Sequence, residues 1–272
     1  MDRLAEGHRM PRSIYIFVGV TFGWSWLCWL PLVLSGASIT PGALPTHVPG
    51  LLGPAIGALV AAATEGKASL KALLRRVVTL RLSPLGWLAA ASPLAFIAAG
   101  LLVDVLMGHR PALDGLRLYP GIPDVGLVLT FIIALVGNGL GEEMGWRGFA
   151  LQRLQARWGQ WGGTIALWPV WMLWHLPLFA IIASYRSMDM VMIVFGWCLG
   201  IFAGNLVLAN VAHLARGSIL AVALWHTLYN FSSATRLGGA SPAVATTLVI
   251  IWALGLIFLR RRRPSDKSLS SP

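Results

Sequence analysis

A small set of residues in this apolar sequence can do acid–base chemistry, and its members are Glu142, Glu143, Arg147, His175, His226 and Asn230. A carboxylate can accept a proton, an imidazole can accept or donate one or bind a metal, and an amide can donate a hydrogen bond. Together these groups can activate water and stabilise an oxyanion, which is what peptide hydrolysis requires.

The two glutamates stand next to each other in the stretch GNGLGEEMGWRGFALQRL. Adjacent side chains point about 100° apart on a helix, so Glu142 and Glu143 cannot share one job. Glu143 and Arg147 are four residues apart and can pair along one face. We therefore interpret that pair as structural and Glu142 as free for chemistry. The alternative for this stretch is a charged helix end that meets water.

The two histidines lie in separate apolar stretches, WPVWMLWHLPLF and ALWHTLYN. Trp171 precedes His175 by four residues, and Asn230 follows His226 by one helical turn. A lone buried histidine is more often a hydrogen-bonded packing residue than a functional one. His226 and Asn230, however, project from one face of a lipid-embedded helix and must face protein or a water-filled cavity.

Signatures of other intramembrane proteases are missing from the sequence. It has no HExxH motif, no pair of aspartates within apolar runs and no GxSxG elbow. Cys28 and Cys198 stand inside apolar runs without a second cysteine at metal-like spacing. We expect both to be small buried hydrophobic residues, because neither spacing suits a metal site or a disulfide.

The composition predicts transmembrane helices as the elements that position these residues. Hydrophobic residues make up 57% of the 272-residue chain and charged residues only 11%, which does not suit a soluble surface. The apolar runs approach 20 residues, the length that crosses ~30 Å of hydrocarbon. The runs lie at 14–35, 48–64, 84–107, 125–143, 162–184, 189–211, 218–235 and 242–259.

The basic residues predict the orientation of the bundle. With an even number of spans and both termini cytoplasmic, 17 of the 21 basic residues fall inside the cell and 4 outside, namely Arg110, Arg117, Arg186 and Arg236. Membrane topology thus explains the net charge of +11 without a nucleic-acid partner. The segment from Trp146 to Trp161 reads as an amphipathic helix at the cytoplasmic interface. Asp104, near the outer end of its run, is expected to reach water as a structural residue.

The three motifs resemble those of the CAAX protease and bacteriocin-processing (CPBP) membrane endopeptidases, a family related to the Ras-converting CAAX endopeptidase. That family carries EExxxR, FxxxH and HxxxN on successive helices of a roughly eight-helix bundle. Residues 142–147, His175 and residues 226–230 match these motifs, and the similarity covers roughly 125–235. Trp171 stands where the pattern has Phe, which alters the expected shape of the substrate pocket.

The resemblance implies a role for each matching residue. Glu142 and His175 would activate the attacking water, and His226 with Asn230 would form the oxyanion hole. Glu143, Arg147 and Trp171 would support them. A zinc ion held by Glu142, His175 and His226 is the alternative. We favour a reaction without a metal or other cofactor, because Asn230 beside His226 suits an oxyanion donor pair better than a ligand.

The sequence as a whole predicts an all-α polytopic membrane bundle of about eight transmembrane helices. Residues 1–124 form the N-terminal helices, 125–235 the catalytic core, and 236–272 the last helix with a basic cytoplasmic tail. The expected partners are membrane lipid and membrane-tethered, CAAX or prenylated substrates, which an intramembrane endopeptidase would cleave. The alternatives are a proton-coupled transporter, since intramembrane ionisable groups often relay protons, and a non-catalytic scaffold or immunity protein.

Overall fold

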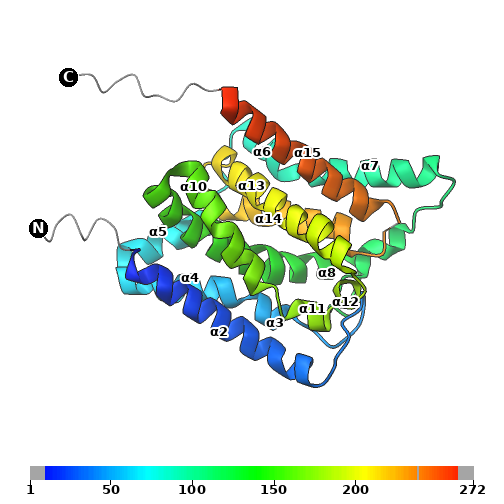
Figure 1. Ribbon diagram of the computed structural model, residues 1–272, viewed down its shortest axis with the longest axis horizontal. Coiled ribbons are helices and arrows are strands. Elements are labelled where there is room, and N and C mark those ends of the chain that lie inside the picture. Colours follow the sequence, from blue (N-terminus) through cyan, green and yellow to red (C-terminus); the bar gives the residue numbers. More distant parts are fainter. Residues whose placement is uncertain (1–9, 238, 263–272) are drawn as a thin grey trace, which may run out of the picture.

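The computed structural model describes residues 10–237 and 239–262 (Figure 1). Within them the chain is helical, with three isolated bridge pairs between loops and no strand. The predicted all-α fold is therefore confirmed. Arg3, Arg9, Arg263 and Lys267, with the rest of the predicted basic tail, lie outside the described residues.

The helices follow one another with short connections. The first half of the chain contains α2 (Arg12–Leu34), α3 (Val48–Leu51), α4 (Gly53–Glu65), α5 (Lys67–Val77), α6 (Pro84–Ala91), α7 (Pro93–Leu106), η1 (Leu113–Arg117) and α8 (Leu127–Ala134). The second half contains η2 (Leu135–Leu140), α9 (Gly141–Gly145), η3 (Trp146–Ala150), α10 (Leu151–Trp174), α11 (Leu178–Ile181), α12 (Ala183–Arg186), η4 (Met192–Cys198), α13 (Leu199–Leu214), α14 (Ile219–Ala234) and α15 (Ser241–Arg262).

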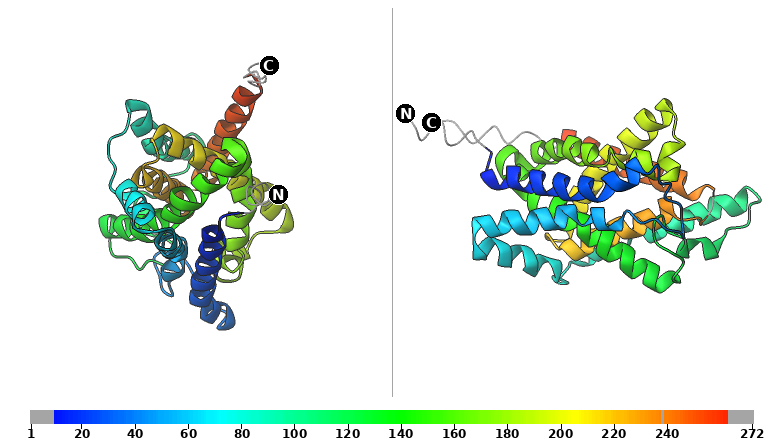
Figure 2. Two further views of the ribbon diagram at one scale, coloured as in Figure 1. Left: turned by 90° about the vertical axis from the view of Figure 1, so that its left-hand side faces the viewer. Right: turned by 90° about the horizontal axis from the view of Figure 1, so that it is seen from below.

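The long helices lie roughly along one another, and the segment that carries the glutamates runs between them. α2 packs against α4, α4 packs against α9, and α14 packs against η2 and α7. Figures 1 and 2 show that α2 begins and α15 ends towards the same end of the bundle, which is also the end where α5 lies. An even number of crossings places the two ends of a chain on one side in this way.

Glycines let the helices around the glutamates approach closely. A Cβ on Gly139 would lie 2.4 Å from Thr227 Oγ1 on α14, and one on Gly145 would lie 2.4 Å from the Pro54 carbonyl oxygen on α4. Small residues at helix contacts are how membrane bundles gain close packing, because lipid supplies no hydrophobic force between helices. The segment 139–145 is thereby fixed between α4 and α14.

The length and apolarity of the described helices support five membrane-crossing segments, or six if the bent pair α6 and α7 counts as one. Each of the eight apolar runs is helical, but the count of about eight crossings is not confirmed. α14 has only 16 residues, and the predicted spans 125–143 and 162–184 lie largely within the single stretch Leu127–Ile181.

The prediction of an interfacial helix from Trp146 to Trp161 is wrong for the first turns. Trp146, Arg147 and Phe149 are at most 1% exposed, and their helix continues directly from α9 into the bundle. Gly159, at φ 71°, then breaks α10, and Gly163 packs against the backbone of Leu154 and Gln155. The chain thus folds back on itself. The burial is tolerated because the charge of Arg147 is balanced inside the protein.

Asp104 does not reach water as expected, since its side chain is 1% exposed. Its Oδ1 atom accepts a hydrogen bond from the backbone N–H of Ala240 at 3.1 Å and lies 3.7 Å from His109 Nδ1. The residue therefore ties the end of α7 to the start of α15, which is a structural role.

Candidate active site

The segment Leu135–Ala150 supplies both glutamates and is wound irregularly. Wide π-type turns at η2 and η3 flank the short helix α9, where Glu142 and Glu143 are both at most 1% exposed. Wide turns of this kind are frequent at functional sites because they re-aim side chains. Here they place two adjacent carboxylates in the interior of the bundle.

Glu142 is held by one hydrogen bond to each carboxylate oxygen. Asn138 Nδ2, one turn earlier, donates to Oε1 at 2.7 Å, and Trp171 Nε1 on α10 donates to Oε2 at 3.0 Å. A carboxylate oxygen has more than one lone pair, so each oxygen can still accept a further hydrogen bond. The position of Glu142 is thus fixed while its capacity to take a proton is kept.

Glu143 belongs to a separate network, as its direction on the helix predicts. Its Oε1 atom accepts hydrogen bonds from Arg147 Nη1 at 3.0 Å and His226 Nδ1 at 2.7 Å. The predicted pairing of Glu143 with Arg147 is confirmed. Arg147 Nη2 also donates to Asn205 Oδ1 at 3.2 Å, and its guanidinium lies 4.2 Å from the Trp171 ring centroid.

His175 lies at the end of α10 among aromatic rings. Its Nδ1 atom is 2.8 Å from the Trp171 carbonyl oxygen, and its ring meets those of Trp174 and Trp197 edge-on. A carbonyl can only accept, so Nδ1 carries the proton and Nε2 of the neutral ring keeps a lone pair. That nitrogen can accept a proton from water.

Asn230 is tied to the Glu142 network through Asn138. Asn230 Nδ2 donates to Asn138 Oδ1, and the Tyr119 hydroxyl donates to the same oxygen at 3.0 Å. Burial raises the pKa of Tyr119, which keeps its hydroxyl protonated as a donor. Asn138 therefore joins Glu142 on α9 to Asn230 on α14.

Trp171 brings the two networks together. It donates to Glu142, accepts from His175 through its carbonyl, and its ring centroid lies 6.0 Å from that of His226. Among the described residues no direct hydrogen bond joins Glu142 to His175. Glu142 contacts the indole N–H of Trp171, and His175 contacts its backbone carbonyl. All the residues predicted to do chemistry thus belong to one connected cluster.

Three members of the cluster were not predicted from sequence: Asn138, Asn205 and Tyr119. Asn138 stands four residues before Glu142, and Asn205 interrupts the apolar run 189–211, where its Nδ2 atom donates to the Thr164 carbonyl at 2.7 Å. Polar amides within apolar spans were a signal that could have found both. Tyr119 offered none, because it lies in a loop.

The residues proposed for zinc do not form a ligand set in this geometry. The described part of the chain has no group of three His, Cys, Asp or Glu side chains placed to hold a metal ion. The Nδ1 atoms of His175 and His226 contact a carbonyl and a carboxylate, which leaves both Nε2 atoms for other partners.

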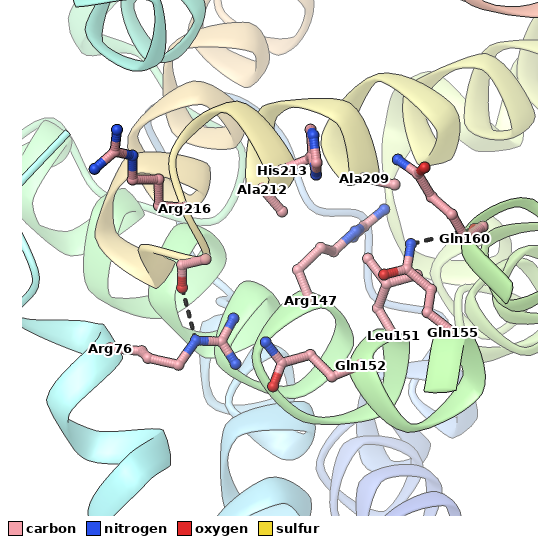
Figure 3. A pocket seen from close by; sticks show the side chains of 11 residues that line it. Arg76, Arg147, Leu151, Gln152, Gln155, Gln160, Ala209, Ala212, His213 and Arg216 are labelled. Carbon is pink, nitrogen blue, oxygen red and sulfur yellow. Dashed lines mark hydrogen bonds between the residues drawn. The ribbon is translucent and has the colours of Figure 1, made fainter. Parts of the chain in front are cut away.

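A basic cavity of about 460 Å³ shares Arg147 with this cluster (Figure 3). Its arginines are largely engaged elsewhere. Arg147 pairs with Glu143, and Arg76 donates to the carbonyls of Gly217 at 2.7 Å and Gly148 at 2.8 Å. In Figure 3 the guanidinium of Arg216 points away from the other two. These bonds hold Arg76 and Arg147 in the cavity wall, so neither guanidinium is fully available to a ligand.

The comparisons with known proteins agree with the motifs. Residues 124–232 match the family described as type II CAAX prenyl endopeptidase Rce1-like. This part of the chain is similar to the Rce1-like family. The resemblance drawn from the three motifs is thereby confirmed. The matched region, residues 124–232, contains Glu142, His175, His226 and Asn230. Together with the long apolar helices, this match indicates an integral membrane protein.

A curated relative matches a shorter stretch of the chain. A 45-residue stretch is 42% identical to the CAAX prenyl protease 2 of Methanococcus maripaludis. The match covers 16% of this chain and 17% of that protein. The chain thus spans about a sixth of the length of the relative.

Proposed function

We propose that the protein is an intramembrane endopeptidase that hydrolyses peptide bonds of membrane-associated substrates, with residues 125–235 as its catalytic core. The observation that carries the proposal is the placement of Glu142 in the bundle interior, with two N–H donors on its carboxylate and His175 on the other side of Trp171. An intramembrane carboxylate is expensive, so its retention in a polar cluster favours a chemical role.

Water is activated by Glu142 and His175. A water molecule held between the Glu142 carboxylate and the lone pair of His175 Nε2 attacks the carbonyl carbon of the scissile bond. One water proton passes to Glu142 as the C–O bond forms, which generates a tetrahedral oxyanion. Glu142 then gives that proton to the leaving amine as the C–N bond breaks, so that protons and electron pairs balance.

His226 and Asn230 stabilise the oxyanion from α14. Asn230 Nδ2 has two hydrogens and uses one on Asn138, so the second is left for the substrate. His226 directs Nδ1 at Glu143, which leaves Nε2 for the substrate. In the imidazolium form, for which Glu143 supplies the balancing charge, Nε2 also donates. Arg147 keeps Glu143 in place for this purpose.

The substrate is proposed to be a membrane-tethered tail, with CAAX or prenylated proteins as the first class to test. The support is the Rce1-like family and the printed name of the Methanococcus relative, a CAAX prenyl protease. Both termini are proposed to be cytoplasmic, because 17 of 21 basic residues then lie inside. The site is reached from that side in this orientation.

The test is turnover by the purified full chain on a panel of peptides tethered to vesicles, with and without prenyl groups. Cleavage of a tethered peptide is expected, with the products identified by mass. The same protein reconstituted in liposomes should carry no pH-driven flux. Flux without cleavage across the panel would establish the transporter alternative, and neither activity would favour the non-catalytic scaffold.

A further inference from the structure

The carboxylate of Glu142 accepts hydrogen bonds from two side chains that the family motifs do not require. Trp171 occupies the position where the FxxxH pattern has Phe, and Asn138 lies outside all three motifs. Each donates one N–H to a different oxygen of the carboxylate, at 3.0 and 2.7 Å. A phenylalanine at position 171 has no N–H, so one of these two hydrogen bonds depends on the tryptophan found here.

The indole of Trp171 is anchored in a way that fixes its N–H. Its ring lies under the guanidinium of Arg147 at 4.2 Å, and its backbone carbonyl accepts from His175 Nδ1 at 2.8 Å. The side chain is 4% exposed. A rigid donor held on both sides can hold the carboxylate in one orientation, whereas a Phe ring would only fill the space.

The amide of Asn138 has a forced orientation. A carboxylate can only accept, so Nδ2 must face Glu142 and Oδ1 must face the donors Tyr119 and Asn230. The side chain is 6% exposed, and the contact with Glu142 spans one helical turn. One side chain therefore sets the distance between the residue proposed as base and the residue proposed as oxyanion donor.

We infer that Asn138 and Trp171 are positioning residues that orient the Glu142 carboxylate for proton transfer, and that Asn138 also aligns Asn230. The inference rests on the proposed function, because it assigns Glu142 the role of base. Proton transfer depends steeply on geometry, and a misplacement of about 1 Å can lower a rate roughly 100-fold. Both residues act through the Glu142 carboxylate, and in this proposal neither contacts the substrate.

The decisive variants remove one donor at a time. Trp171→Phe keeps an aromatic ring and loses the N–H, and replacement of Trp171 by benzothienylalanine loses the N–H with nearly the same shape. Asn138→Leu removes the amide donor and keeps a side chain of similar size. Each variant is expected to lower kcat roughly 10- to 100-fold, with KM changed less than about threefold.

A matched control comes from one turn earlier on the same helix. Trp168 carries a buried Nε1 atom without a hydrogen-bond partner among the described residues, and its ring packs on Phe202. Trp168→Phe removes the same atoms but no hydrogen bond, so kcat should stay within about twofold. Equal losses at positions 168 and 171 would show that ring volume, and not the N–H, is what matters.

Failure of this inference is separable from failure of the proposed function. Full kcat in both the benzothienylalanine and the Asn138→Leu proteins, together with an inactive Glu142→Gln protein, would overturn the positioning role and leave the hydrolytic site standing. Normal turnover by Glu142→Gln would remove the base itself, and the inference with it.

Discussion

Replacing Arg147 by alanine should destabilise the protein strongly. The Glu143 and Arg147 side chains are 0% and 1% exposed, and their Oε1 and Nη1 atoms are 3.0 Å apart. Removing one partner of a buried pair leaves an uncompensated charge and typically costs about 3 to 5 kcal/mol. The loss of the bond to Asn205 acts in the same direction. We expect a value in that range for Arg147→Ala.

A solvent-exposed pair of the same chemistry calibrates the measurement. Arg117 and Asp124 lie 3.1 Å apart with side chains 47% and 38% exposed, and such surface pairs are worth about 0 to 1 kcal/mol. The assay is unfolding of the full chain in mixed micelles, read as a free energy for Arg147→Ala and Arg117→Ala. The Glu143→Gln/Arg147→Met double variant should recover part of the loss, since it leaves no buried charge unpaired.

The reasoning would be refuted if Arg147→Ala and Arg117→Ala were destabilised equally. Full stability of Arg147→Ala with abolished turnover would instead move Arg147 from a supporting role into the catalytic set.

Three further results are expected. Asn230→Ala should lower the turnover rate about 10²- to 10³-fold as an oxyanion donor is lost, whereas a loss below tenfold in the cleavage assay would remove that role. Exhaustive chelation should leave turnover intact, and one zinc per chain lost together with activity would establish the metal alternative by elemental analysis. Burial lowers the pKa of His47 to about 4, below its ordinary value of 6.5. Between these two pH values the unfolded state binds more protons than the folded state. The free energy of unfolding should therefore fall as pH drops from 6.5 to 4. His47→Gln should lack that part of the pH dependence in unfolding titrations, and an identical profile would contradict it.

The sequence predicted the residues with chemistry better than it predicted their neighbours. Glu142, His175 and His226 stand out because ionisable groups are rare in apolar runs, and the spacing of Glu143 and Arg147 is a local property of one helix. The roles of Asn138 and Tyr119 depend on contacts between η2, α14 and a loop. Such contacts join residues up to 92 positions apart and leave no local pattern.

The errors have the same origin. The stretch after Trp146 looked interfacial because of its arginines, yet Arg147 is buried against Glu143, and Arg153 instead donates to Glu65 at the end of α4. Asp104 was expected to need water, but its Oδ1 atom accepts a backbone N–H from 136 residues away. In each case a tertiary partner replaces the solvent that a local reading assumes.

The most direct test of the central claim is the turnover of Glu142→Gln on a tethered peptide that the wild-type protein cleaves. Glutamine keeps the shape of the side chain and cannot take a proton from water. We expect a folded protein, judged by its unfolding transition, with hydrolysis products at background level. Product formation by the folded Glu142→Gln protein at a rate near that of wild type would contradict it.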